Sequence, residues 1–176
     1  LDLFTSEEVE GKEVQGLVQR TASRIGAECA ALRSAPDFHR FRLTRGEERE
    51  VIDMVVDRAP QLDAVKREIE GIRVDTVREM IANKLTTLLS RTELKDVVDL
   101  YFLEQAGYDL LAAIPDARAK DGGWDPAVVS MLLANLRVTE TPAWMIKELA
   151  PSDLVAFLNR LRLAIAAQAL PGPSST

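Results

Sequence analysis

The sequence has few of the residues that build disulfides and zinc sites. Among its 176 residues there is one cysteine, Cys29, and one histidine, His39. One cysteine excludes an internal disulfide, and one cysteine with one histidine cannot complete a tetrahedral zinc site within a single chain. Any metal that the chain holds by itself is therefore expected to have carboxylate ligands.

Long apolar runs and an excess of positive charge are also lacking. Charged residues interrupt every apolar run well before the roughly 18 residues that a membrane span needs, and no basic-then-apolar leader is present. The sequence therefore predicts a soluble cytoplasmic protein with no membrane partner. The formal net charge of −6 argues against non-specific coating of nucleic acid, which needs many Lys and Arg contacts to phosphates, but it leaves room for a local basic patch.

The first sixty residues have the patterns of one helix and several strands. After the segment LDLF, which predicts a strand, an apolar stripe with helical spacing predicts a helix over residues 6–25. Alternating segments with turn residues between them then predict a meander of three strands, with the sequences ECAAL, FHRFRL and EVIDMVV.

Beyond Arg73 the sequence predicts about five helices. Their start signals are Thr76 with Glu79, Ser90 or Thr92, Asp125 with Pro126, and Pro151 with Ser152. The core stripe of the last helix is expected to comprise Leu154, Phe157, Leu158, Leu161 and Ile165. Trp124 and Trp144 are expected to be packing anchors.

These patterns together predict an α+β fold. A partial sheet lobe with a mixed or antiparallel sheet is expected over residues 1–72. A helical bundle lobe is expected over residues 73–170, followed by a disordered tail over 171–176.

One acidic residue interrupts the last predicted strand. Side chains alternate along EVIDMVVD, so Asp53 shares a face with Val51 and Val55 while Ile52 and Met54 line the other face. Asp53 is then either a functional carboxylate or a residue on the solvated side of an antiparallel sheet. The strand alone does not decide between the two.

A lysine lies in the apolar stripe of the helix TVREMIANKLTTLLSR. The stripe comprises Val77, Met80, Ile81 and Leu88, and Lys84 falls inside it, with Arg91 continuing the same face. Because an unpaired buried ammonium costs several kcal/mol, Lys84 must reach the rim, meet a carboxylate or meet a bound phosphate.

Two carboxylates lie three residues apart in the next helix, ELKDVVDLYFL. Asp96 and Asp99 are therefore neighbours on one side of a helix that is apolar nearly all round. They either form a structural salt-bridge network with Lys84 and Arg91, or serve catalysis while those cations hold a polyphosphate.

The order of these motifs resembles the AbiEii/AbiGii (MenT-like) toxin family of nucleotidyltransferases in the polymerase-beta superfamily. That family has an Asp-x-Asp strand motif, a third carboxylate on a later strand, and a helical K-L…R…K/R-D-x-x-D-L signature. The matching residues are Asp2 for the second aspartate, Asp53 for the third carboxylate, and Lys84, Leu85, Arg91, Lys95, Asp96, Asp99 and Leu100 for the helical signature. The family's glycine motif and first aspartate would precede Asp2, and this sequence begins after them.

The resemblance implies an enzyme that transfers a nucleotide from an NTP to an acceptor such as a tRNA end. By this resemblance Asp2 and Asp53 hold Mg²⁺, and Lys84 with Arg91 contacts the triphosphate. Asp96 and Asp99 either orient Lys84 or serve the acceptor. A toxin-antitoxin or phage-defence role and a cognate antitoxin protein are also implied.

Two further expectations concern partners and the competing class of protein. Arg40, Arg42 and Arg45 lie on or beside one predicted strand and are expected to form the rim of any RNA groove. The alternative function is a non-catalytic binding or scaffold protein with a degenerate nucleotidyltransferase fold, or an inactive fragment, in which the buried charges form a structural network.

Overall fold

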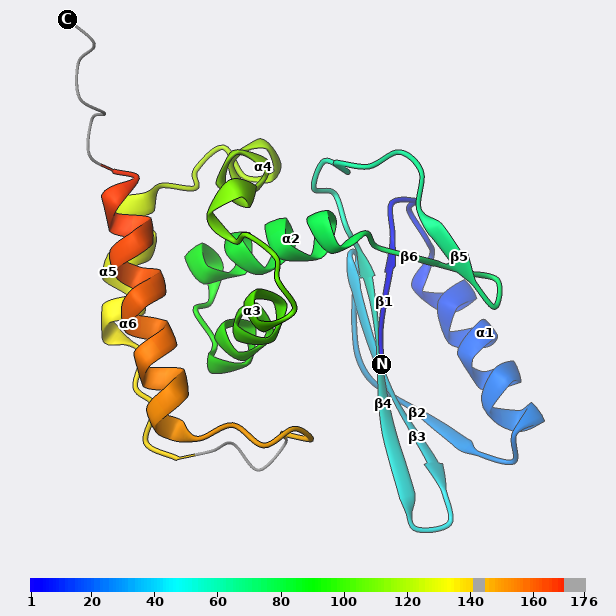
Figure 1. Cartoon of the computed structure of the whole chain (residues 1–176). Coiled ribbons are helices and arrows are strands. Elements are labelled where there is room, and N and C mark those ends of the chain that lie inside the picture. Colours follow the sequence, from blue (N-terminus) through cyan, green and yellow to red (C-terminus); the bar gives the residue numbers. More distant parts are fainter. Residues whose placement is uncertain (141–144, 170–176) are drawn as a thin grey trace, which may run out of the picture. The chain divides into compact units, whose positions relative to one another are not determined.

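The computed structural model describes residues 1–140 and 145–169, which form two compact units, Leu1–Ala59 and Pro60–Thr176 (Figure 1). The structure is of the α+β class, as the sequence predicts. The predicted lobe boundary after residue 72 stays a prediction. No helix in the described ranges is long and apolar enough to cross a membrane.

The first unit is a mixed sheet with a helix on one face. Its strands lie in the order β1-β4-β3-β2, with β1 parallel to β4 and the other neighbours antiparallel. Its elements are β1 (Asp2–Thr5), α1 (Gly11–Arg24), β2 (Glu28–Ala35), β3 (Phe38–Arg45) and β4 (Glu48–Val56). The predicted LDLF strand and three-strand meander are confirmed.

Helix α1 buries an apolar face of the sheet. Val14 and Val18 of α1 form a core with Phe41 of β3, and Ile52 and Met54 of β4 pack against this core. Because side chains alternate along a strand, the intervening residues of β3 and β4 lie on the opposite face, which α1 does not cover. This second face is called the open face below.

Helix α1 is shorter than the sequence predicts. It begins at Gly11 rather than at residue 6, because Glu10 has an extended backbone and the Thr5 hydroxyl accepts a hydrogen bond from the Glu7 backbone N–H (3.1 Å), which forms a turn. The acidic residues before Gly11 thus belong to a connecting segment.

The second unit consists of a hairpin and a helical bundle. Its elements are β5 (Arg67–Ile69), β6 (Ile72–Val74), α2 (Val77–Ser90), α3 (Leu94–Gln105), a short 3₁₀ turn η1 (Leu111–Ala113), α4 (Ile114–Lys120), α5 (Pro126–Asn135) and α6 (Pro151–Ala167). All five residues of the predicted α6 stripe are buried. Trp124 is buried and donates a hydrogen bond to the Leu85 carbonyl (2.8 Å), which confirms its packing role.

Capping residues define several of the helix ends. The Asp125 carboxylate accepts hydrogen bonds from the backbone N–H groups of Ala127 and Val128, so the predicted Asp125-Pro126 start is confirmed. The start of α3 differs from the prediction, because Glu93 occupies the N-cap position without a side-chain cap. Thr92 instead has φ 46 and donates its hydroxyl to the Leu88 carbonyl (2.6 Å).

Two further predictions about the second unit are wrong. The hairpin β5–β6 is absent from the prediction because its turn is Glu70-Gly71, with φ values of 51 and 80, and glutamate is a rare choice for a left-handed turn position. Met80 lies at the edge of the buried stripe of α2 and is 36% exposed, while Glu79 and Ala82 are buried in its place. Trp144 and the predicted tail 171–176 lie outside the described residues.

The contact between α1 and β3 yields a prediction about stability. A Cβ atom added at Gly11 would lie 2.8 Å from the buried His39 ring, whereas one added at Gly16 would meet only the flexible end of Arg20 at 3.2 Å. We expect Gly11→Ala to lower the free energy of unfolding by about 1–3 kcal/mol through overpacking. Gly16→Ala should be neutral or stabilising by up to about 1 kcal/mol, because alanine favours the helix interior. Urea unfolding of both variants measures the difference, and equal effects would contradict the prediction.

Candidate functional site

Two carboxylates lie side by side on the open face of the sheet. Asp2 and Asp53 are register partners on the parallel strands β1 and β4. Neighbouring strands are about 4.8 Å apart, and directly paired residues point to the same face. The sheet therefore brings together two aspartates that are 51 positions apart in the sequence, as the resemblance predicts.

Asp53 is also tied to an arginine on the next strand. Arg40 of β3 is its partner in the antiparallel register. The guanidinium binds the carboxylate with two hydrogen bonds, Nε to Oδ1 at 2.7 Å and Nη2 to Oδ2 at 2.5 Å. These bonds, with the charges of Asp53 and Asp2, raise the pKa of Arg40 above its usual value. The Asp53 side chain is 13% exposed, so it is a half-buried, ion-paired residue rather than a freely solvated one.

The donor set of this pair suits a hard divalent cation. Carboxylate oxygens are the ligands that Mg²⁺ prefers, and Mg²⁺ is usually bound by one or two protein carboxylates together with substrate phosphates. Residues 1–140 and 145–169 contain no cluster of three or more metal-ligating side chains. The donor chemistry of Asp2 and Asp53 is therefore compatible with such a cation.

The second unit holds four of the five charged residues of the predicted helical signature, all but Lys95, in one network. Asp96 of α3 has a fully buried side chain and binds both cations. Lys84 of α2 donates to Asp96 Oδ1 at 3.1 Å and forms an ion pair with Asp99 Oδ2 at 2.5 Å. Arg91 donates from Nε and Nη2 to the two Asp96 oxygens, each at 3.0 Å.

The network shifts the pKa values of Asp96 and Lys84. Burial raises the pKa of Asp96, but hydrogen bonds and charge from Arg91 and Lys84 outweigh it and leave that pKa below its usual value. Burial lowers the pKa of Lys84, but the bonds to Asp99 and Asp96 outweigh it and raise that pKa overall. Asp96 and Lys84 are therefore both charged at neutral pH.

The same network has a solvent-facing side. Lys84 is 26% exposed, Asp99 is 46% exposed and Arg91 is 43% exposed, whereas Asp96 is inaccessible. Asp96 thus acts as a buried anchor that holds the two cationic head groups close together.

A third set of charges has no counterpart in the sequence reasoning. Glu79 was expected to complete a capping box with Thr76, but only half of that motif forms: the Thr76 hydroxyl accepts from the Glu79 N–H at 3.1 Å. The buried Glu79 carboxylate instead accepts from the N–H groups of Leu62 (2.9 Å) and Asp63 (3.3 Å), and pairs with Lys120.

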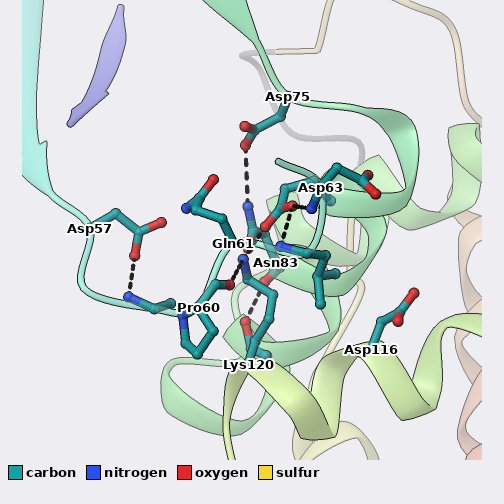
Figure 2. Close-up of polar contacts among 12 residues, drawn as sticks. Asp57, Pro60, Gln61, Asp63, Asp75, Asn83, Asp116 and Lys120 are labelled. Atoms are coloured by element: carbon teal, nitrogen blue, oxygen red, sulfur yellow. Dashed lines mark hydrogen bonds and ion pairs between the residues drawn. The ribbon is translucent and has the colours of Figure 1, made fainter. Parts of the chain in front are cut away.

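Lys120 completes this arrangement at the end of α4. Its ammonium also donates to the Pro60 carbonyl at 2.9 Å, so the segment 60–63 is held against α2 and α4 (Figure 2). The partners Glu79 and Lys120 are 41 positions apart, and no local pattern around Lys120 signals its burial. Only tertiary structure reveals the pair.

The aspartates near this segment do not form a metal site. Asp116 is paired with Arg78 through two hydrogen bonds of 2.7 and 2.5 Å, which lower the pKa of Asp116. Asp75 is paired with Lys66 at 2.5 Å. Asp63 accepts from the Thr76 hydroxyl and from Arg78. Figure 2 shows these carboxylates separated around the segment rather than converging on one point.

Solved structures identify the fold as that of nucleotidyltransferases. The chain is similar to a candidate nucleotidyltransferase from H. pylori, with 19% identity and a TM-score of 0.55 over 96% of this chain and 78% of that one. It is equally similar to JHP933 from Helicobacter pylori, with 19% identity and a TM-score of 0.55 over 96% of this chain and 75% of that one. A search among curated proteins gave no match.

The family follows from the sequence profile. Residues 2–170 match the profile described as "Nucleotidyl transferase AbiEii toxin, Type IV TA system", and the chain therefore belongs to the AbiEii nucleotidyl transferase toxin family. The resemblance found in the sequence is confirmed. This membership implies a nucleotide substrate and a cognate antitoxin.

The buried carboxylate of α3 yields a prediction about stability and pH. Asp96→Asn should lower the free energy of unfolding by about 3 kcal/mol at pH 7, because two cations lose their buried counter-charge. The pKa of Asp96 is depressed in the folded state. Its stabilising effect is thus present above the unfolded pKa of about 3.9 and lost as the pH falls through the lower folded pKa.

Urea unfolding at several pH values measures this effect. The stability difference between wild type and Asp96→Asn should shrink below about pH 4. The matched control is Asp99→Asn, which removes a carboxylate that is 46% exposed and should cost less than about 1 kcal/mol. A stability difference that stays constant from pH 7 to pH 3 would contradict the assignment.

The buried pair of α2 and α4 yields a second prediction. Lys120→Met should destabilise the protein by about 3–5 kcal/mol, because the buried Glu79 carboxylate loses its counter-charge. The double variant Glu79→Gln/Lys120→Met should recover part of that loss, since the neutral amide can still accept the backbone N–H bonds. Arg160→Met is the control, because it removes an exposed pair with Glu104 and should cost less than about 1 kcal/mol. Additive losses in the double variant would refute the predicted coupling.

Proposed function

We propose that this chain transfers a nucleotide from an NTP to an RNA acceptor such as a tRNA end, with pyrophosphate as the leaving group. The observation that carries the proposal is the register pairing of Asp2 and Asp53 on the open face, within a chain of the AbiEii family. The proposed setting is a toxin-antitoxin or phage-defence system in the cytoplasm, where NTPs and tRNA occur.

In this proposal Asp2 and Asp53 hold the divalent cation, which we take to be Mg²⁺. When bound, such a cation neutralises triphosphate charge and lowers the pKa of an attacking hydroxyl. Arg40 donates two hydrogen bonds to Asp53 and so orients its carboxylate. On substrate binding, Arg40 releases one Asp53 oxygen or both.

Lys84 and Arg91 contact the triphosphate in this proposal. Lys84 supplies a compact positive charge, and Arg91 supplies a planar fork that matches phosphate oxygens. The buried Asp96 carboxylate positions both cations through its hydrogen bonds to each of them. A phosphate replaces Asp99 beside Lys84 in this proposal, because Asp99 is the more exposed of the two carboxylates that Lys84 contacts.

A non-catalytic binding or scaffold function is the alternative. It is favoured by one observation: the carboxylates Asp53 and Asp96 are each bound by arginine, so the charges already satisfy one another in this structure. Under this alternative the ion pairs are structural, and replacing a whole pair by apolar residues would be neutral or stabilising.

A transfer assay tests the proposed function. The complete gene product that contains this chain is incubated with Mg²⁺, each labelled NTP and total tRNA, and labelled RNA is counted. We expect transfer by wild type, a loss on the order of 100-fold for Lys84→Ala, and a similar loss for Asp53→Asn. Arg160→Ala, an exposed arginine of the same unit as Lys84, should transfer normally. Absence of transfer with every NTP would favour the scaffold alternative, and transfer that is indifferent to Lys84→Ala would contradict the role proposed for Lys84.

A further inference from the structure

The open face of the sheet gathers arginines from three neighbouring strands. The register places Phe38, Arg40 and Arg42 of β3 opposite Val55, Asp53 and Val51 of β4, so all of these share the open face. Arg49 of β4 lies opposite Thr44 and belongs to the same face. The same face also carries the acids Asp2, Asp53 and Glu28, of which Asp53 is paired with Arg40.

A β-bulge adds a further arginine to this face. From Glu28 to Ala31, β2 pairs with β3 in one register, and the register shifts by one residue before Arg33. Without the shift Arg33 would oppose His39, whose ring is buried on the α1 face. With it, Arg33 opposes Arg40 on the open face. Because a one-residue slip exchanges the two faces of a strand, the bulge re-aims this arginine.

Two of these arginines flank an aromatic ring. The guanidinium carbons of Arg33 and Arg40 each lie 5.4 Å from the centroid of the Phe38 ring. The three side chains form a group of flat π and guanidinium surfaces. Arg40 and Arg33 continue the row that begins with Asp2 and Asp53, and Phe38 lies in the next row of the same face. Aromatic rings and guanidinium planes are the groups on which unpaired bases stack.

The remaining arginines of the face have no acidic partner. Arg42 and Arg49 are exposed, and within the described ranges neither side chain has an ion pair or hydrogen bond. Arg45, by contrast, lies on the α1 side of β3 and is paired with Glu48 at 2.8 Å. The open face therefore differs from the rim expected from the sequence. It includes Arg42, as expected, but Arg45 lies on the other face, and Arg33 and Arg49 are additional members.

We propose that this open face binds single-stranded RNA, with phosphates on Arg42 and Arg49 and a base stacked on the Phe38, Arg33 and Arg40 group. The combination favours RNA over an acidic peptide, because a peptide would use the charges but not the stacking group. The proposal rests on the proposed function, since the bound strand is the nucleotide acceptor. The end of the bound RNA strand would then lie in the same row of the sheet as Asp2 and Asp53.

Fluorescence anisotropy tests the proposal in the absence of NTP. A short labelled single-stranded RNA is titrated with wild type, with Arg42→Gln/Arg49→Gln, and with the matched control Arg20→Gln/Arg24→Gln, which removes the same charge from α1 on the other side of the sheet. We expect the first variant to bind about tenfold more weakly and its salt slope to fall by about 1.4, because each phosphate contact on a single strand contributes about 0.7. The control should bind like wild type.

A third variant separates stacking from charge. Phe38→Leu keeps an apolar side chain but removes the ring, so it should weaken binding about tenfold without changing the salt slope. Double-stranded RNA of the same sequence and vesicles with anionic lipid serve as competitors, and both should compete poorly. Melting curves confirm that each variant is folded.

Several outcomes would overturn the proposal. Equal weakening in the Arg42/Arg49 and Arg20/Arg24 variants would show non-specific charge attraction, and competition by anionic vesicles would show the same. Normal binding by all variants would place the RNA elsewhere. Failure of the proposed function gives a different result. If RNA binding depends on Arg42, Arg49 and Phe38 but the protein transfers no nucleotide, the RNA-binding face is supported and the transferase activity is contradicted.

Discussion

A fully buried carboxylate shared by two cations is the interaction on which the helical unit depends. Asp96 neutralises Lys84 and Arg91 within a helix that is otherwise packed by apolar side chains. Its burial costs free energy unless both cations stay bound, so the three groups fix the relation of α2 to α3. The same constraint holds two cationic head groups together at a solvent-facing edge. The group that stabilises the contact between α2 and α3 thus also holds together the two cations that we propose for phosphate binding.

In the sheet unit the charges are reversed, with one arginine beside two carboxylates. Two aspartates on parallel strands would repel each other, and Arg40 offsets that repulsion with a bidentate pair to Asp53. Both Asp53 oxygens accept from Arg40, so in the proposed function a divalent cation takes over one or both of them. The Arg40–Asp53 pair is thus compatible with a cation site in which arginine neutralises the carboxylate when no cation is bound, and also with a purely structural ion pair. The proposed function includes a corresponding exchange in the helical unit, where a phosphate replaces Asp99 beside Lys84.

Local patterns in the sequence were sufficient for most of the elements, but not for the hairpin β5–β6 or for the distant pairs. Alternation located the three meander strands, and helical spacing located the α6 stripe and the anomalous Lys84. Asp2 and Asp53 were placed together only through resemblance to a family, because register between distant strands has no local signal. Glu79 and Lys120 were missed for the same reason. The bulge that re-aims Arg33 was invisible because no glycine or proline marks it.

The most direct test of the account is whether nucleotide binds through the carboxylates and cations described. Melting temperatures of the complete gene product are measured with Mg²⁺ alone and with Mg²⁺ plus each NTP, for wild type and for Asp53→Asn. At NTP concentrations about 100-fold above Kd, binding stabilises the folded state by about 2.7 kcal/mol, a rise of several degrees. The account predicts this rise for wild type and its loss in Asp53→Asn. An unchanged melting temperature with all NTPs would contradict it.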